Sequence, residues 1–122
     1  MRILLVEDQD SIRHMIETLV QASGHEVRSV ASGDDAVEVA LKERFDIVLL
    51  DLMLPGGLDG IGVVKRLRAD EATKKTPVFV LSAMDDAETQ RRVLEAGATA
   101  FYAKPFRPLE LLSHIKRAAA KT

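Results

Sequence analysis

The sequence predicts an α/β fold in which helices cover both faces of a parallel sheet, and two observations lead to this prediction. Short apolar runs alternate five times with longer stretches whose apolar residues recur at helical spacing. Residues 46–51 contain four consecutive apolar residues, as in a strand that is buried on both faces of a parallel sheet. Short links between alternating strands and helices favour right-handed crossovers, which place helices on both faces.

Each element has its own signal in the sequence. The predicted strands cover residues 3–6, 27–30, 46–51, 77–81 and 100–103; all are mainly apolar except the second, which is more polar. Residues suited to helix boundaries stand between them: capping side chains, a proline for a first turn, and glycines that can adopt the left-handed conformation of a helix end. They are Ser32, Asp85 or Asp86, and Pro108 at helix starts, and Gly24 and Gly97 at helix ends.

Length and composition limit the class of protein. The 122 residues, 47% of them hydrophobic and 30% charged, suit a single globular domain over residues 1–122. The absence of cysteine excludes disulfides, thiolate metal sites and a cysteine nucleophile. A net charge of −2 lacks the bulk positive charge of a typical nucleic-acid binder, so we expect no direct contact with nucleic acid.

The sequence also bears on location. No apolar run approaches the roughly 20 residues that span a membrane. Glu7 and Asp8 end the first apolar run too early for the core of a signal peptide. We therefore expect a cytoplasmic protein that makes no membrane contact.

Ionisable and hydroxyl side chains follow four of the five predicted strands. Glu7 and Asp8 follow the first strand, Asp51 ends the third, Ser82 follows the fourth and Lys104 follows the fifth. Open α/β sheets bind ligands at the carboxyl ends of their strands, where the strand order reverses. If the order is 2-1-3-4-5, these three carboxylates, one hydroxyl and one ammonium share that edge of the sheet.

Such a set suits the chemistry of phosphoryl groups. Three clustered carboxylates repel one another, and a hard divalent cation with oxygen ligands, above all Mg²⁺, relieves the repulsion. A carboxylate can attack phosphorus to give an aspartyl phosphate. A metal ion and a lysine would neutralise the oxygens of the transferred group.

These residues carry a resemblance to a known family. Five short stretches, in order and each at or near a strand end, are similar to the receiver domain of two-component response regulators over essentially the whole chain. The stretches are ILLVED at 3–8, IVLLDLMLPG at 47–56, VLSA at 80–83, GA at 97–98 and KPF at 104–106. The resemblance implies a flavodoxin-like (βα)5 three-layer sandwich with a five-stranded parallel sheet of order 2-1-3-4-5.

The resemblance also implies roles for the acidic residues. Asp51 would be the phosphoacceptor. Mg²⁺ would be bound directly by Asp8 and Asp51 and by the backbone carbonyl of Met53, with Glu7 in or beside the ligand shell.

The remaining roles concern the phosphoryl group and the switch. Ser82 and Lys104 would bind the phosphoryl oxygens, and the peptide bond between Lys104 and Pro105 would be cis. The switch would pair Ser82 with Phe101, where the family more often has tyrosine, so coupling here would run through packing alone. Tyr102 would point to the opposite face of the strand.

The function implied is a phosphorylation-switched signalling module rather than a turnover enzyme. A sensor histidine kinase or a histidine phosphotransfer protein would supply the phosphoryl group, and the domain would assist its own phosphorylation and dephosphorylation. Partner binding would change through the face formed by the fourth helix, fifth strand and fifth helix. The downstream partner and a phosphorylation-dependent homodimer are left open.

One stretch departs from the family. The segment from Pro55 to Gly60 has one more residue than usual, and its adjacent glycines predict a looser loop beside the acceptor. A degenerate receiver that binds a partner without phosphorylation is therefore an alternative, if this insertion is disabling.

The sequence disfavours two other classes of protein. An aspartate-nucleophile phosphohydrolase would need a second carboxylate two residues after the nucleophile, where Met53 stands. Binding of flavin mononucleotide would need a Ser/Thr/Gly-rich phosphate loop after the first strand, and residues 7–10 are acidic instead.

Overall fold

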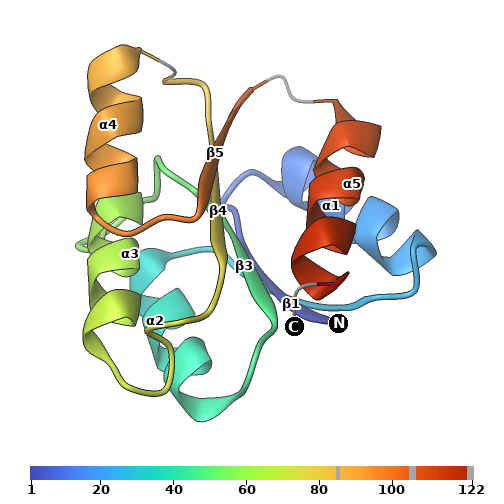
Figure 1. Cartoon of the computed structure of the whole chain (residues 1–122), viewed down its shortest axis with the longest axis horizontal. Helices are drawn as coiled ribbons and strands as arrows, with labels where there is room; N and C mark the ends of the chain where they lie inside the picture. Colours follow the sequence, from blue (N-terminus) through green and yellow to red (C-terminus); the bar gives the residue numbers. More distant parts are fainter. Residues whose placement is uncertain (85, 105–106, 121–122) are drawn as a thin grey trace.

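The computed structural model describes residues 1–84, 86–104 and 107–120. Strands and helices alternate along the whole chain (Figure 1). The strands are β1 (Arg2–Val6), β2 (Glu26–Val30), β3 (Ile47–Asp51), β4 (Val78–Ser82) and β5 (Ala100–Ala103). The helices are α1 (Asp10–Ala22), α2 (Gly33–Lys42), α3 (Gly60–Ala69), α4 (Ala87–Glu95) and α5 (Pro108–Ala120).

The sheet has the predicted topology. Its order is β2-β1-β3-β4-β5 and every neighbouring pair is parallel, which confirms the flavodoxin-like class. Several strand bounds differ by one residue from the prediction. At β4, for example, the strand begins at Val78, because Pro77 has no N–H to donate to a ladder and contributes only its carbonyl, which accepts from the Val48 N–H at 2.9 Å.

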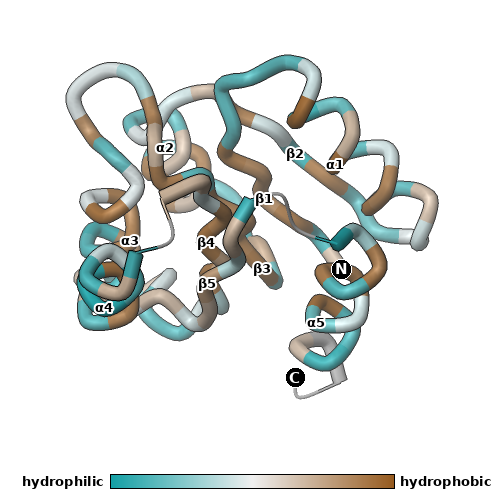
Figure 2. Tube along the Cα trace, turned by 90° about the horizontal axis from the view of Figure 1, so that it is seen from above, coloured by the Kyte–Doolittle hydropathy of each residue, from teal (hydrophilic) through white to brown (hydrophobic). Residues whose placement is uncertain are grey.

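Two separate apolar cores lie on the two faces of the sheet. Helices α2, α3 and α4 cover one face, and α1 and α5 cover the other (Figure 1). Successive residues of a strand point to opposite faces, so Leu4 and Val6 join the first core while Ile3 and Leu5 join the second. Figure 2 shows the resulting concentration of apolar residues in the central strands. Burial on both faces explains why the central strands read as unbroken apolar runs.

The predicted helix boundaries are borne out where the structure describes them. The Ser32 hydroxyl accepts the backbone N–H three residues on at 3.2 Å, and Asp86 caps α4 in the same way. Asp85, the alternative cap, lies outside the described residues. Gly24 and Gly97 have φ of +88° and +115°, the left-handed conformation that glycine adopts freely.

Among the described residues, every helix is too short or too polar to cross a membrane.

Candidate functional site

The strand order brings the predicted polar residues to one edge of the sheet. The carboxyl ends of β1, β3, β4 and β5 are neighbours, and the order reverses between β1 and β3. Glu7 and Asp8 directly follow β1, Asp51 is the last residue of β3, Ser82 is the last of β4, and Lys104 directly follows β5. The set predicted from the sequence therefore lies where open α/β sheets bind ligands.

Three carboxylates form the centre of this site. One oxygen of each of Glu7, Asp8 and Asp51 lies within 4.8 Å of the others. Glu7 and Asp51 are 1% and 6% exposed, whereas Asp8 is exposed to solvent. Two buried anions and one exposed anion are a donor set that fits a hard, partly hydrated cation such as Mg²⁺, because it leaves room for water and phosphate oxygens. The Met53 carbonyl belongs to the loop that follows Asp51.

Lys104 supplies the cation of the site. Its ammonium Nζ donates to Glu7 Oε1 at 2.8 Å and lies 3.6 Å from Asp51 Oδ1. The Lys104 backbone N–H donates to the Ser82 carbonyl at 2.8 Å, which fixes the start of this side chain against the end of β4. The predicted lysine thus reaches both buried carboxylates.

The carboxylates influence one another strongly. Burial, together with the hydrogen bond and the negative charge of Glu7, raises the pKa of Asp51 to about 7, although Lys104 opposes the shift. Burial also raises the pKa of Glu7, but hydrogen bonds with Lys104 and Asp51 outweigh burial and hold that pKa below its ordinary value. The opposite directions of the two shifts mean that Asp51 holds a proton more readily than Glu7 does, and a bound divalent cation would favour its release.

Backbone N–H groups complete the site. The Met53 N–H donates to Asp51 Oδ1 at 3.3 Å, and the Met84 N–H donates to the Ser82 hydroxyl oxygen at 3.0 Å. No side-chain pattern could have predicted these donors, because every residue type except proline carries a backbone N–H. Both methionine side chains are exposed and border the site.

The two candidate switch residues lie on the same face of the sheet. Phe101 is opposite Val80 in the β4–β5 ladder and packs against the core under α2, α3 and α4. Ser82 lies two residues further along β4, hence on that face as well. Tyr102 points to the other face, as predicted, and contacts His114 of α5. The predicted cis bond between Lys104 and Pro105 falls on a residue outside the described ones.

The loop between β3 and α3, in which the sequence predicts an extra residue, packs closely against α2 and against the end of β3. A Cβ at Gly33, the first residue of α2, would lie 2.2 Å from the Leu58 carbonyl oxygen. A Cβ at Gly60 would lie 2.6 Å from the Leu52 Cα. Asp59 caps α3 by accepting the Gly62 N–H at 2.8 Å. Close packing therefore holds the second half of this loop, while Gly56 takes a positive φ of +88° in the first half.

Comparison with known families gives one match that covers nearly the whole chain. Residues 3–116 match the model of the response regulator receiver domain.

Curated relatives are transcriptional regulators of about twice this length. The chain is 39% identical over 115 residues to the phosphate regulon transcriptional regulatory protein PhoB of Escherichia coli, covering 94% of this chain and 50% of that protein. It is 33% identical over 120 residues to the transcriptional regulatory protein SrrA of Staphylococcus aureus, covering 98% of this chain and 48% of that protein. The chain thus spans about half the length of the curated relatives it matches.

Solved structures match over nearly their full length. The chemotaxis protein CheY4 of Vibrio cholerae superposes with a TM-score of 0.89 at 34% identity, covering 96% of this chain and 97% of that chain. The receiver domain of the sensor histidine kinase PA1611 of Pseudomonas aeruginosa superposes with a TM-score of 0.88 at 35% identity, covering 95% and 94%. That domain has a magnesium ion coordinated in its active-site cleft.

Proposed function

The chain belongs to the receiver domains of two-component response regulators, which serve phosphorylation-switched signalling, and from this premise we propose that Asp51 accepts a phosphoryl group in a Mg²⁺-dependent reaction. The observation that carries the proposal is the position of Lys104, whose ammonium lies within reach of both Asp51 and Glu7. A buried carboxylate beside a cation and two further carboxylates suits nucleophilic attack on phosphorus.

The transfer step uses the residues at the edge of the sheet. An Asp51 carboxylate oxygen forms a bond to phosphorus while the phosphorus–nitrogen bond of a phosphohistidine breaks, and the electron pair stays on the imidazole nitrogen. Bound Mg²⁺, held by Glu7, Asp8, Asp51 and the Met53 carbonyl, would neutralise charge on the phosphoryl oxygens. The Lys104 ammonium moves from Glu7 to a phosphoryl oxygen, which keeps it paired throughout.

The readout starts at Ser82. Its hydroxyl accepts the Met84 N–H in the present state and can donate to a phosphoryl oxygen on Asp51. Phe101 lies on the same face and follows this movement through packing, since it has no hydroxyl of its own. Partner binding then changes through the face formed by α4, β5 and α5.

The proposed partners follow from the chemistry. The donor is a phosphohistidine on a sensor histidine kinase or a histidine phosphotransfer protein, and we place this exchange in the cytoplasm. Residues 1–122 act as one receiver domain that assists its own phosphorylation and dephosphorylation without multiple turnover. It makes no direct contact with nucleic acid or membrane. Its downstream partner is a protein, and a second copy of this chain is one candidate.

Intact mass spectrometry tests the proposal. The protein is incubated with acetyl phosphate or phosphoramidate, with and without Mg²⁺, beside an Asp51→Asn variant. We expect one added phosphoryl group that requires Mg²⁺ and is lost in the variant. A folded protein that gains nothing would contradict the proposal and favour a degenerate receiver, and deletion of Gly57 would then test whether the longer loop is the cause.

A further inference from the structure

A groove of about 640 Å³ lies at the amino ends of β3 and β4, at the opposite edge of the sheet from the acidic site. The connection from α2 to β3 forms one wall, and the connection from α3 to β4 forms the other. Ala40, Phe45, Val48 and Leu67 are the buried apolar members of its lining, and together they are called its base here. Ligand-binding clefts have volumes of roughly 300–1,000 Å³ and largely apolar linings. The volume of the groove therefore falls within the range of small-molecule sites.

Arginine side chains behind the groove fix both walls. Arg2 donates from Nη1 to the Arg44 carbonyl at 2.8 Å, and its guanidinium lies 4.9 Å from the centre of the Phe45 ring. On the other wall, Arg68 donates from Nη1 to the Thr76 carbonyl at 2.7 Å. Walls that are held in place before binding lose little conformational entropy when a ligand enters.

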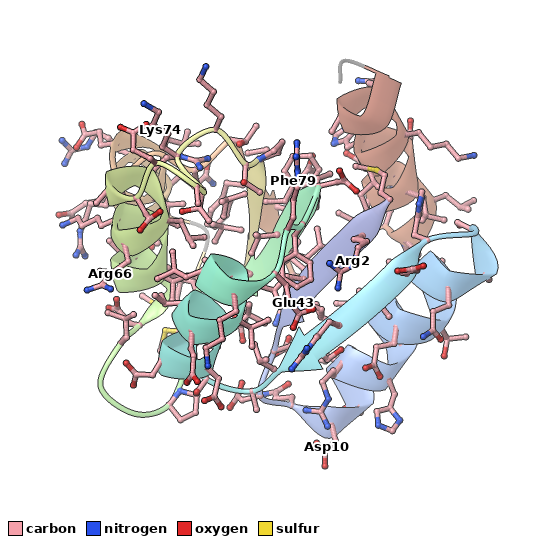
Figure 3. All side chains as sticks on the ribbon, turned by 90° about the horizontal axis from the view of Figure 1, so that it is seen from below. Arg2, Asp10, Glu43, Arg66, Lys74 and Phe79 are labelled. Atoms are coloured by element: carbon pink, nitrogen blue, oxygen red, sulfur yellow. The ribbon has the colours of Figure 1, made fainter. Side chains whose placement is uncertain are left out.

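The acidic residues of the lining already have partners. Glu43 accepts from Arg2 at 2.7 Å, and the two side chains lie next to each other in Figure 3. Glu71 pairs with Lys74 at 2.7 Å. Asp46 accepts the backbone N–H of Arg2 at 2.8 Å. Glu43 and Glu71 are therefore paired with cations, whereas Asp46 is hydrogen-bonded to a neutral N–H and keeps its negative charge.

Two of the three basic residues in the lining have no such partner. The exception is Lys42, which pairs with Glu38 at 2.9 Å. Arg44 and Lys75 are exposed, and within the described part of the chain neither side chain makes a hydrogen bond or ion pair. Arg44 belongs to one wall and Lys75 to the other. An apolar base between two unpaired cations is complementary to a molecule that is apolar at one end and anionic at the other.

We propose that this groove binds a small amphipathic anion, with an aromatic or branched apolar body over Phe45 and Leu67 and a carboxylate that pairs with the free cations of the walls. The site is separate from the carboxyl edge of the sheet, so it does not depend on phosphorylation of Asp51. Binding there would act on the α2–β3 and α3–β4 connections.

The probe for the test is 4-phenylbutyrate, compared with 4-phenylbutan-1-ol, which has the same apolar body without the charge. Each is titrated into ¹⁵N-labelled, unphosphorylated protein and followed by amide chemical shifts. We expect saturable shifts concentrated in residues 40–48 and 71–77, with the alcohol binding about two- to fivefold more weakly for each ion pair that it cannot form. Absence of shifts, shifts centred on residues 7, 51 and 104, or equal affinities for acid and alcohol would each overturn the proposal.

Charge-reversal variants complete the test. Arg44→Glu and Lys75→Glu should each weaken binding of 4-phenylbutyrate by about fivefold or more. Lys65→Glu, which reverses an exposed cation on α3 outside the groove, is the matched control and should bind as the wild type does. The amide spectra themselves show that each variant is folded. Wild-type affinity in both groove variants would refute the assignment.

Discussion

Replacing Arg68 with methionine should destabilise the protein by about 2–3 kcal/mol, although Arg68 has no carboxylate partner among the described residues. The guanidinium joins three segments of the chain. It donates to the Gly97 carbonyl at 2.8 Å and to the Thr76 carbonyl at 2.7 Å, and more weakly to the Thr73 carbonyl at 3.3 Å. It therefore ties α3 to the start of β4 and to the end of α4.

The magnitude follows from the two short hydrogen bonds. A hydrogen bond to a charged group contributes about 1.5–3 kcal/mol when its partner is buried, and less when water can replace the donor. Arg68 is half-buried, so we assign about 1–1.5 kcal/mol to each short bond and little to the longer ones. Methionine keeps the apolar stem that packs against Gly97, so the change removes mainly the polar contacts.

Equilibrium unfolding in urea, followed by far-ultraviolet circular dichroism, measures the effect. With a urea dependence of about 1–3 kcal/mol/M for a small domain, the midpoint should fall by roughly 0.7–3 M. Arg66→Met is the matched control, because Arg66 lies on the same helix, is exposed and points away from the molecule (Figure 3). Its effect should stay within about 0.5 kcal/mol. Equal midpoints for the Arg68 and Arg66 variants would refute the reasoning.

Three further predictions follow from particular contacts. Gly33→Ala should destabilise the protein by about 1–3 kcal/mol in urea unfolding, because its Cβ would lie 2.2 Å from a backbone oxygen. The Cβ of Gly57→Ala would meet only a side-chain oxygen at 3.8 Å, so this control should be nearly neutral. Similar losses of stability in the two variants would contradict the packing argument. Burial, followed by the charge of a nearby glutamate, raises the pKa of Tyr102, so the absorbance titration of this tyrosine should have a midpoint above 10. The stability that this group contributes should be lost as the pH rises through that midpoint. A midpoint at or below 10 in the folded protein would contradict the prediction. Lys104→Met should slow phosphorylation by acetyl phosphate about 100-fold, while Lys65→Met should leave it unchanged in the same mass assay; equal rates would remove Lys104 from the proposed mechanism.

Much of the fold was predictable, because burial on both faces leaves a simple signal. The central strands β1, β3 and β4 are mainly apolar because both of their faces are covered. Residues such as Ser32 and Gly97 mark helix boundaries by their own conformational preferences. The one-residue differences in strand bounds arise because ladder partners, and not hydropathy, decide where a strand begins. Arg2 joins β1, for example, because it pairs with Glu26 of β2.

The sequence predicted which residues meet at the candidate site better than it predicted the contacts between their side chains. Polar residues at strand ends must meet at one edge once the sheet is parallel. Which atoms pair is a matter of rotamer and burial, so the sequence did not reveal that Lys104 lies closer to Glu7 than to Asp51. Arg68 and the unpaired cations of the groove have no sequence signature at all, since a basic residue on a helix or in a loop is usually solvated.

The alternation of side chains along β5 has a consequence for how this domain can change over time. Phe101 and Tyr102 are neighbours in the chain, yet they pack into different cores, one with α4 and the other with α5. A mutation at one of them alters contacts in a single layer. Phe101→Tyr would place a hydroxyl in the layer of Ser82 and leave the contact between Tyr102 and His114 in place. Substitutions on the two faces of β5 can therefore accumulate independently, since a change in the contacts with α4 leaves the contacts with α5 in place.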